Sequence, residues 1–395
     1  MSIAGIPVLY MRGGSSKGLF FLASDLPEDA AARDRLLARA VGSPDAFGTQ
    51  IDGMGGATSS TSKVVVISPS GRPGYDVDYL FGAVDIGAGG VDWSGNCGNL
   101  SAAVGPFAIE RGLVRAPAEG LATVRIWQAN LGSPILARVP MRGGRVLEEG
   151  GFVIDGVAFP GAEIALSFAE PEREEPRGIF PTGRLVDRLE VSGLGTIEVT
   201  LIDAGNPSVF ARAADLGLEG TELPAAINAD GAALARFEAL RAAGAVAMGL
   251  ASTAAEASAK RPHTPKLAFV APIAPYPSTA GVPVAAESID LCARIVSMGR
   301  LHHAMTGTGA VALAAAAAVP GTIVAEAAAG RGGRSLRIGH PAGSMAAGAE
   351  VERRGEIWVM REATMSRSAR VLMEGSVRVP VEMMSHNVSI EGREG

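Results

Sequence analysis

Cysteine is scarce in this sequence, and so are charged and aromatic residues. Cys97 and Cys292 are the only 2 cysteines, too few for the disulfide framework of a small secreted protein. Charged residues make up 19%, and a net charge of −6 without a long basic run argues against nucleic acid as the main partner. The longest apolar run, residues 310–319, falls far short of the roughly 20 residues that a membrane span needs. Residues 1–7 lack the basic and apolar regions of a signal peptide, so we expect a cytoplasmic protein without a membrane partner.

The length of the chain and its apolar content predict two domains of similar size. The chain has 395 residues, more than one ordinary core holds, and hydrophobic residues make up 47% of it. A charged segment bounded by prolines, residues 171–176, is typical of a surface loop near a domain boundary. We therefore divide the chain into residues 1–185 and residues 186–395.

A polar, glycine-flanked turn carries Cys97 directly into an apolar run of small residues. The run that follows, residues 100–107, reads as a helix, which places Cys97 at its N-terminus. The free backbone N–H groups and the positive dipole at that end favour a thiolate and bind carboxylates or phosphates. The alternative is a buried cysteine acting as a small hydrophobe. The polar, turn-forming neighbours of Cys97 favour the reactive cysteine.

Lys63 stands where a long polar loop meets a strand. Residues 50–62 are mostly polar or glycine, and residues 64–67 are β-branched and apolar. Such a loop loses much conformational entropy on ordering, which suggests that it lines a site. Partial desolvation at the junction would favour the neutral amine that acts as a base. The alternative is a solvated lysine at a strand edge.

A second basic loop, residues 11–18, joins two predicted strands and carries Arg12, Ser15, Ser16 and Lys17. It is either an anion cradle or a glycine-rich hairpin. It is not a P-loop, because the GxxxxGK[ST] spacing is absent and a strand follows it.

The second half of the chain repeats the arrangement around Cys97. A polar turn runs into an alanine-rich helix, residues 310–319. The turn consists of Met305, Thr306, Gly307, Thr308 and Gly309. The chain therefore reads as a degenerate duplication in which two helix N-termini face a shared cleft. Such a cleft suits a small di- or tricarboxylate. In the Gly-Asn-Pro turn, Asn206 is placed to donate to a carboxylate.

Other segments give expectations that the structure can test. Asp25 is expected to cap a helix ending before Gly42, and Cys292 to lie in the core on a helix over residues 288–298. Strands are expected at residues 6–10, 19–22, 64–67, 77–84, 123–128, 135–140, 152–154, 163–168, 196–202, 264–270, 322–325, 335–339, 356–361 and 376–379, and a helix at residues 232–250. The basic segment 366–370 is expected to be an exposed strand edge rather than a ligand contact. No metal site is expected at His302 and His303, because adjacent histidines do not share a helix face and no other ligand accompanies them.

Long ordered motifs resemble the PrpF family, whose best-known members are 2-methylaconitate cis-trans isomerases. The resemblance covers nearly the whole chain. It rests on Met11-Arg12-Gly13-Gly14-Ser15-Ser16-Lys17-Gly18, residues 50–63, Asp92-Trp93-Ser94-Gly95-Asn96-Cys97-Gly98-Asn99, Gly205-Asn206-Pro207, Met298-Gly299-Arg300-Leu301-His302-His303-Ala304-Met305 and residues 365–375. It implies an α+β fold like that of diaminopimelate epimerase, with two pseudo-equivalent domains, each an antiparallel β-sheet rolled around a central helix.

The resemblance also implies a mechanism without a cofactor or a metal. Lys63 and Cys97 match the proton-transfer residues of the family. The second cysteine of related epimerases falls near Met305 and Thr306, which argues against a two-thiol amino-acid racemase. The residues expected to bind substrate are Arg12, Ser15, Ser16, Lys17, Ser62, Asn96, Gly98, Asn99, Asn206, Met305, Thr306, Gly307, Thr308 and Gly309.

The expected reaction is allylic proton transfer on an unsaturated tricarboxylate, most simply the cis-trans isomerisation of 2-methylaconitate. The alternatives are a related isomerase or tautomerase acting on 4-oxalomesaconate, trans-aconitate or a methylitaconate-like acid, and a noncatalytic carboxylate-binding protein. The sequence does not decide the oligomeric state, and a homodimer is one option.

Overall fold

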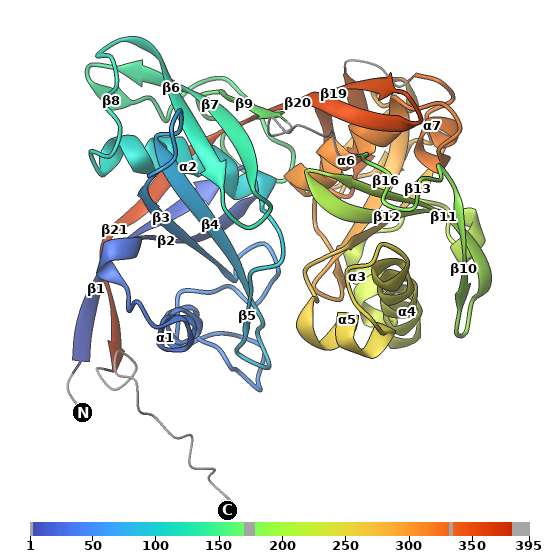
Figure 1. Cartoon of the computed structure of the whole chain (residues 1–395), viewed down its shortest axis with the longest axis horizontal. Coiled ribbons are helices and arrows are strands. Elements are labelled where there is room, and N and C mark those ends of the chain that lie inside the picture. The colour runs from blue at the N-terminus through green and yellow to red at the C-terminus, as the bar shows by residue number, and fades with distance from the viewer. Residues whose placement is uncertain (1–2, 170–177, 332–334, 381–395) are drawn as a thin grey trace, which may run out of the picture.

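The computed structural model describes residues 3–169, 178–331 and 335–380, and shows two lobes side by side (Figure 1). The segment 171–176, expected to be a surface loop, lies outside the described residues. The helices are α1 (Ala30–Val41), α2 (Gly98–Glu110), α3 (Pro224–Ala229), α4 (Gly231–Ala247), α5 (Ala254–Lys260), α6 (Gly307–Ala317) and α7 (Ile323–Ala327). Within the described part of the chain, no helix is long and apolar enough to cross a membrane.

The first lobe is built mainly from strands of the first half of the chain. They are β1 (Ile3–Gly13), β2 (Ser16–Leu22), β3 (Lys63–Pro69), β4 (Val77–Val84), β5 (Val91–Asp92), β6 (Gly120–Gln128), β7 (Ser133–Arg142), β8 (Arg145–Val146) and β9 (Ile164–Ala169).

The remaining strands belong to the second half of the chain. They are β10 (Asp187–Val191), β11 (Gly195–Ala204), β12 (Asn206–Arg212), β13 (Lys266–Ala271), β14 (Tyr276–Pro277), β15 (Pro283–Val284), β16 (Leu291–Ser297), β17 (Arg300–Leu301), β18 (Leu336–His340), β19 (Gly343–Arg354), β20 (Ile357–Arg367) and β21 (Ala369–Pro380).

The two halves pair their strands in the same order, which confirms the predicted duplication. In the first half, β1–β2 is antiparallel, β2–β3 parallel, β3–β4 and β4–β5 antiparallel, β4–β6 parallel and β6–β7 antiparallel. In the second half, β11–β12, β12–β13, β13–β16, β16–β17, β16–β18 and β18–β19 repeat these orientations one by one. Each sheet is therefore mostly antiparallel, with two parallel pairs that the sequence reading did not include.

Each sheet wraps around one buried helix, α2 in the first lobe and α6 in the second (Figure 1). Every residue of α6 is buried, and so is every residue of α2 up to Ala108. Glycine and alanine dominate α6 and supply 5 of the 13 residues of α2, so the surrounding strands can approach both helices closely. A single cluster of buried apolar side chains includes residues of both helices, so the two lobes share one core.

The last two strands connect the lobes. β20 pairs with β19 on one side and with β9 on the other, and it crosses from one lobe to the other in Figure 1. β21 pairs with β1 and so lies in the sheet of the first lobe. The division into residues 1–185 and 186–395 stays a prediction.

Two of the predicted elements are wrong in type. Residues 288–298 do not form a helix, because Leu291–Ser297 is the strand β16, with every residue buried. A short apolar run buried on both faces has no period that separates helix from strand. Cys292 is nevertheless in the core, as expected, with no exposed surface. Residues 322–325, expected to be a strand, begin the helix α7, and the Thr322 hydroxyl caps it by accepting from the Ala325 N–H at 3.0 Å.

Two local expectations are also corrected. Asp29, not Asp25, caps α1: its carboxylate accepts from the Ala32 N–H at 2.7 Å, and Asp25 ends a short 3-10 turn. Residues 152–154 form no strand, and Phe152 makes only an isolated bridge to Gly161.

Candidate active site

Lys63 and Cys97 lie in direct contact inside the first lobe. Lys63 is the first residue of β3, and its Nζ donates to the Cys97 Sγ at 3.4 Å and to the Ser16 Oγ at 3.0 Å. The two residues are only 5% and 7% exposed. Because an amine and a thiol in hydrogen-bond contact can pass a proton between them, this pair can perform acid–base chemistry away from bulk water.

Cys97 is the N-cap of α2, as the sequence predicted. Its carbonyl accepts from the hydroxyls of Ser101, at 3.1 Å, and Tyr79, at 3.4 Å. Burial, together with the adjacent Cys97, raises the pKa of Tyr79 well above its usual value. Tyr79 therefore stays a neutral donor that helps to fix the Cys97 backbone.

The N-termini of α2 and α6 meet at two glycines. A Cβ added to Gly98 would lie 2.7 Å from the Thr308 nitrogen, and one added to Gly307 would lie 2.7 Å from the Gly98 carbonyl carbon. Only glycine permits this approach. At the start of α6, the Thr306 hydroxyl accepts from the Gly309 N–H at 3.2 Å. Two positive helix ends side by side favour an anionic ligand.

Asn206 binds the Cys97 turn across the boundary between the lobes. Its carboxamide accepts from the Asn96 N–H at 3.1 Å and donates to the Asn96 carbonyl at 3.2 Å. Both residues are buried. The sequence analysis expected Asn206 to donate to a ligand carboxylate. In the structure its side chain binds a peptide group of the protein.

Arg367 is a residue of the site that sequence reasoning missed. The basic segment 366–370 was expected to be an exposed edge, but Arg367 is 4% exposed and its Nε donates to the Asn99 Oδ1 at 2.9 Å. Asn99 in turn donates to the Ser15 Oγ at 3.1 Å. Burial lowers the pKa of Arg367 to about 10, which leaves it charged at neutral pH. Among the described residues no carboxylate pairs with this guanidinium, so it adds positive charge beside the α2 N-terminus.

The basic loop forms the wall of a cavity of about 430 Å³. Its lining includes Arg12, Ser15, Ser16, Lys17 and His303. Because Ser16 also accepts from Lys63, its hydroxyl connects this cavity to the Lys63–Cys97 pair. The Arg12 guanidinium donates to two backbone carbonyls, and burial, with Arg370 nearby, lowers its pKa. The ammonium of Lys17 lies 5.3 Å from the centre of the Tyr10 ring.

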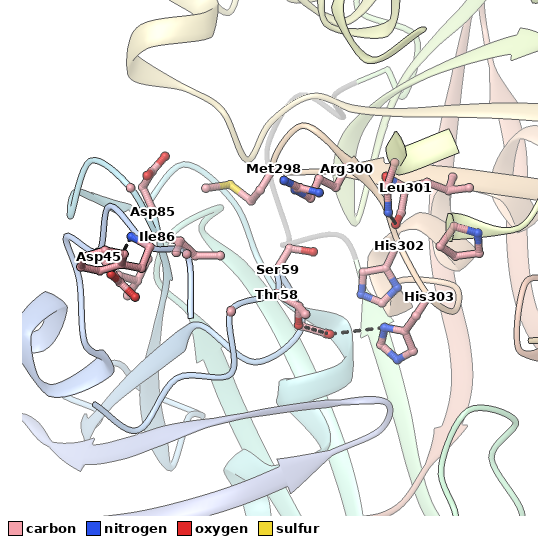
Figure 2. Close-up of a pocket in the computed structure, with 18 of the residues that line it drawn as sticks. Asp45, Thr58, Ser59, Asp85, Ile86, Met298, Arg300, Leu301, His302 and His303 are labelled. Atoms are coloured by element: carbon pink, nitrogen blue, oxygen red, sulfur yellow. Dashed lines mark hydrogen bonds between the residues drawn. The ribbon is translucent and has the colours of Figure 1, made fainter. Parts of the chain in front are cut away.

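A larger cavity, of about 730 Å³, lies between the lobes (Figure 2). It is lined by loops of the first lobe around Asp45, Thr58 and Asp85. The second lobe contributes Met298, Arg300, Leu301, His302 and His303. The Ser60 hydroxyl lies 3.3 Å from the His303 Nδ1, and Thr58, Ser60 and His303 also line the smaller cavity. The two cavities therefore adjoin at these three residues.

Two of the residues expected to bind substrate make other contacts in the structure. The Ser62 hydroxyl donates to the Gln50 Oε1 at 2.7 Å and so holds the polar loop. Met305 is 1% exposed and belongs to the core shared by the two lobes.

The second lobe adds a buried basic cluster, of which the sequence analysis considered only His302. His263 and Lys266 are buried, and the Lys266 Nζ lies 3.0 Å from the His263 Nδ1. His302 is also buried and stacks on His303 with a ring separation of 4.6 Å. Burial, with neighbouring positive groups, lowers the pKa of His263 and of His302 well below 6.5, so both rings are neutral. Within the described residues no group of three His, Cys, Asp or Glu could hold a metal ion.

Comparison with known proteins places these features in a family. Residues 3–380 match the family described as PrpF protein. The chain is 55% identical over 385 residues to the 2-methyl-aconitate isomerase of Shewanella oneidensis, an alignment that covers 95% of this chain and 97% of that protein. It is 37% identical to the crystal structure of a methylitaconate-delta-isomerase, with a TM-score of 0.74, 98% of this chain covered and 99% of the other.

A more distant structure defines the fold. A probable proline racemase from Agrobacterium radiobacter is 14% identical, with a TM-score of 0.54, and covers 94% of this chain and 92% of that one. The chain therefore has the racemase and epimerase fold, as the sequence predicted. In this fold two pseudo-equivalent lobes each wrap around a helix, and here the N-termini of the two helices meet. Among proteins of this fold, the chain belongs to the PrpF family.

Proposed function

We propose that this protein is a 2-methylaconitate cis-trans isomerase in which Lys63 and Cys97 move the proton. The observation that carries the proposal is the 3.4 Å contact between the Lys63 Nζ and the Cys97 Sγ, buried beside two helix N-termini. The relative that is 55% identical over nearly its whole length is named for this activity, which supports an isomerase.

In this mechanism Lys63, as the neutral amine, removes a proton from the carbon next to the double bond of the substrate. The electron pair left behind delocalises into a dienolate, so the former double bond gains single-bond character and can rotate. The Cys97 thiol then returns a proton to the carbon framework. At this point Lys63 is an ammonium and Cys97 a thiolate, and their direct contact lets the proton pass from nitrogen to sulfur. That transfer restores the starting state.

The surroundings supply the charge that an anionic substrate and its dienolate need. The N-termini of α2 and α6 stabilise negative charge, and buried Arg367 adds a cation that has no carboxylate partner in the described residues. Arg12, Ser15, Ser16 and Lys17 line the adjoining cavity, where we assign them to the substrate carboxylates. The helix ends are shaped by Asn96, Gly98, Asn99, Thr306, Gly307, Thr308 and Gly309. Because the N–H groups of Asn96 and Gly309 already donate to Asn206 and Thr306, we assign substrate binding to the backbone N–H groups of Gly98, Asn99, Gly307 and Thr308.

A methylitaconate-like acid is the second candidate substrate, because a related crystal structure is that of a methylitaconate-delta-isomerase. The same proton abstraction would serve it, with return of the proton to a different carbon. The higher identity to the 2-methyl-aconitate isomerase, 55% against 37%, favours the first candidate. A cytoplasmic location and a homodimer are further parts of the proposal.

The test is a nuclear magnetic resonance assay in heavy water with the purified protein. Samples of 2-methylaconitate, a methylitaconate, trans-aconitate and 4-oxalomesaconate are followed for isomerisation and for deuterium incorporation. We expect 2-methylaconitate to interconvert fastest and to gain deuterium at the allylic carbon. Binding of all four acids without exchange would show a carboxylate-binding protein and would overturn the proposal.

A further inference from the structure

The second lobe holds the turn of the first lobe that leads into the proposed catalytic thiol, residues 92–96. The Asp92 carboxylate accepts from the backbone N–H of His263 at 2.7 Å. The hydroxyls of Ser94 and Thr264 lie 2.6 Å apart, within hydrogen-bond distance. Both contacts come from two adjacent residues of the second lobe, which we call the 263–264 clamp.

The clamp also packs closely against the backbone of this turn. A Cβ added to Gly95 would lie 2.6 Å from the His263 Cδ2 and 2.6 Å from the Thr264 Cγ2, closer than real side chains approach. Gly95 therefore lets the turn rest directly on both clamp residues. His263 is 3% exposed and Thr264 is fully buried, so water does not compete for these contacts.

The clamp is itself fixed from behind by a buried arginine of α4. Arg241 is 3% exposed, and its guanidinium donates to the Thr264 carbonyl at 3.2 Å. It also donates to the carbonyls of Arg261, at 3.0 Å, and Ala257, at 3.2 Å, and it pairs with Glu238. A buried guanidinium with one carboxylate and three carbonyl acceptors fixes the loop before β13. The clamp is therefore a firm support for the turn.

The direction of the Cys97 side chain depends on the two planar peptide groups that flank its Cα. The group after the Cα is held within the first lobe, where the Cys97 carbonyl accepts from two hydroxyls. The group before it carries the Asn96 carbonyl, which accepts from the Asn206 carboxamide of the second lobe at 3.2 Å. Residues of both lobes therefore orient the backbone that points the thiol at Lys63.

We infer that Thr264 is a positioning residue of the reaction, which holds the turn of residues 92–96 so that the Cys97 thiol meets the Lys63 amine. The catalytic pair lies in the first lobe, but its geometry depends on the second. The two atoms are 3.4 Å apart, and a displacement of about 1 Å at a reacting group can cost about a hundredfold in rate. The inference deepens the proposed function, because it rests on proton transfer between these two groups.

The test compares variants of the full chain that change one hydroxyl each. Thr264→Val and Ser94→Ala delete the two ends of the contact between the lobes, and Thr264→Ser keeps the hydroxyl. Thr200→Val is the matched control, at a fully buried threonine of the second lobe. The Thr200 hydroxyl donates to the Leu185 carbonyl at 2.8 Å and accepts from the Ile323 N–H at 3.0 Å. Its loss should destabilise the fold without touching the turn.

The first measurement is the alkylation of both cysteines by iodoacetamide at about pH 9.5, where free thiols are largely ionised and the rate reports access to the sulfur. Mass spectrometry separates the two peptides, and Cys292, in the core of the second lobe, reports opening of the fold. We expect the ratio of the Cys97 rate to the Cys292 rate to rise about fivefold in Thr264→Val and Ser94→Ala, since each variant loses a hydrogen bond. The ratio should not rise in Thr264→Ser or Thr200→Val.

The second measurement is the turnover of 2-methylaconitate by the same variants. In Thr264→Val and Ser94→Ala, kcat should fall about tenfold while KM stays within about twofold, because the groups assigned to the carboxylates are unchanged. Thr264→Ser and Thr200→Val should turn over at close to the wild-type rate. An unchanged alkylation ratio or an unchanged kcat in Ser94→Ala overturns the inference, also where Thr264→Val does not fold. Because alkylation needs no substrate, a wild-type protein inactive on every acid would contradict the proposed function, while the ratio still decides the role of the clamp.

Discussion

Replacing Lys266 by methionine should flatten the dependence of stability on pH above neutrality. Burial lowers the pKa of Lys266 to about 7 in the folded protein, whereas an unfolded lysine keeps a value near 10.5. At a pH between these two pKa values, the unfolded chain binds more protons than the folded one. The folded state therefore becomes more stable as the pH rises through this window, and less stable as it falls.

The size of this stability change follows from the difference between the folded and unfolded pKa values of Lys266. At pH 7 the buried lysine destabilises the fold by about 4 kcal/mol, and at pH 9 by about 2 kcal/mol, because the unfolded chain then holds its proton less strongly. Between these two pH values the wild type should gain about 2 kcal/mol relative to Lys266→Met. Ionisations of groups that do not interact with Lys266 are common to both proteins and cancel in the difference.

The assay is urea unfolding of both proteins at pH 7, 8 and 9, with Lys260→Met as a surface control. The wild type and the control should become more stable relative to Lys266→Met as the pH rises. Parallel stability curves for the wild type and Lys266→Met would show that Lys266 keeps an ordinary proton affinity, and would refute this reasoning.

Two further substitutions test the geometry of the site. Arg367→Gln removes the buried cation and its hydrogen bond to Asn99. We therefore expect KM for a tricarboxylate to rise at least tenfold, with a smaller effect on stability. An unchanged KM would show that Arg367 does not contribute to substrate binding. Gly307→Ala places a methyl group 2.7 Å from the Gly98 carbonyl carbon, which should lower stability by about 1–3 kcal/mol and reduce turnover. Gly71→Ala, where an added Cβ meets nothing within 4 Å, is the control measured by the same unfolding and rate assays.

The sequence predicted local features of the site well. Cys97 was placed at a helix N-terminus because a polar turn precedes a run of small residues, and the structure shows it as the N-cap of α2. The same pattern identified the turn before α6. The pairing of Lys63 with Cys97 came from the family resemblance, because nothing in their spacing brings the two together.

Features that depend on contacts between distant strands could not be predicted from the sequence. Arg367 is buried because the junction of β20 and β21 passes the start of α2, far away in sequence. Thr264 meets Ser94 only because the segments beside β13 and β5 come together, 170 positions apart in the sequence. β16 was taken for a helix because a short, fully buried run has no diagnostic period.

The most direct test of the central claim is the turnover of 2-methylaconitate by Lys63→Ala, followed by nuclear magnetic resonance in heavy water. Loss of a general base typically lowers the rate by about 10²–10⁴-fold, and we predict a loss of this size in both isomerisation and deuterium incorporation, with the protein still folded. Lys260→Ala should behave as the wild type. Near-full activity in Lys63→Ala would contradict the account, because the buried amine that touches Cys97 would then not be the base.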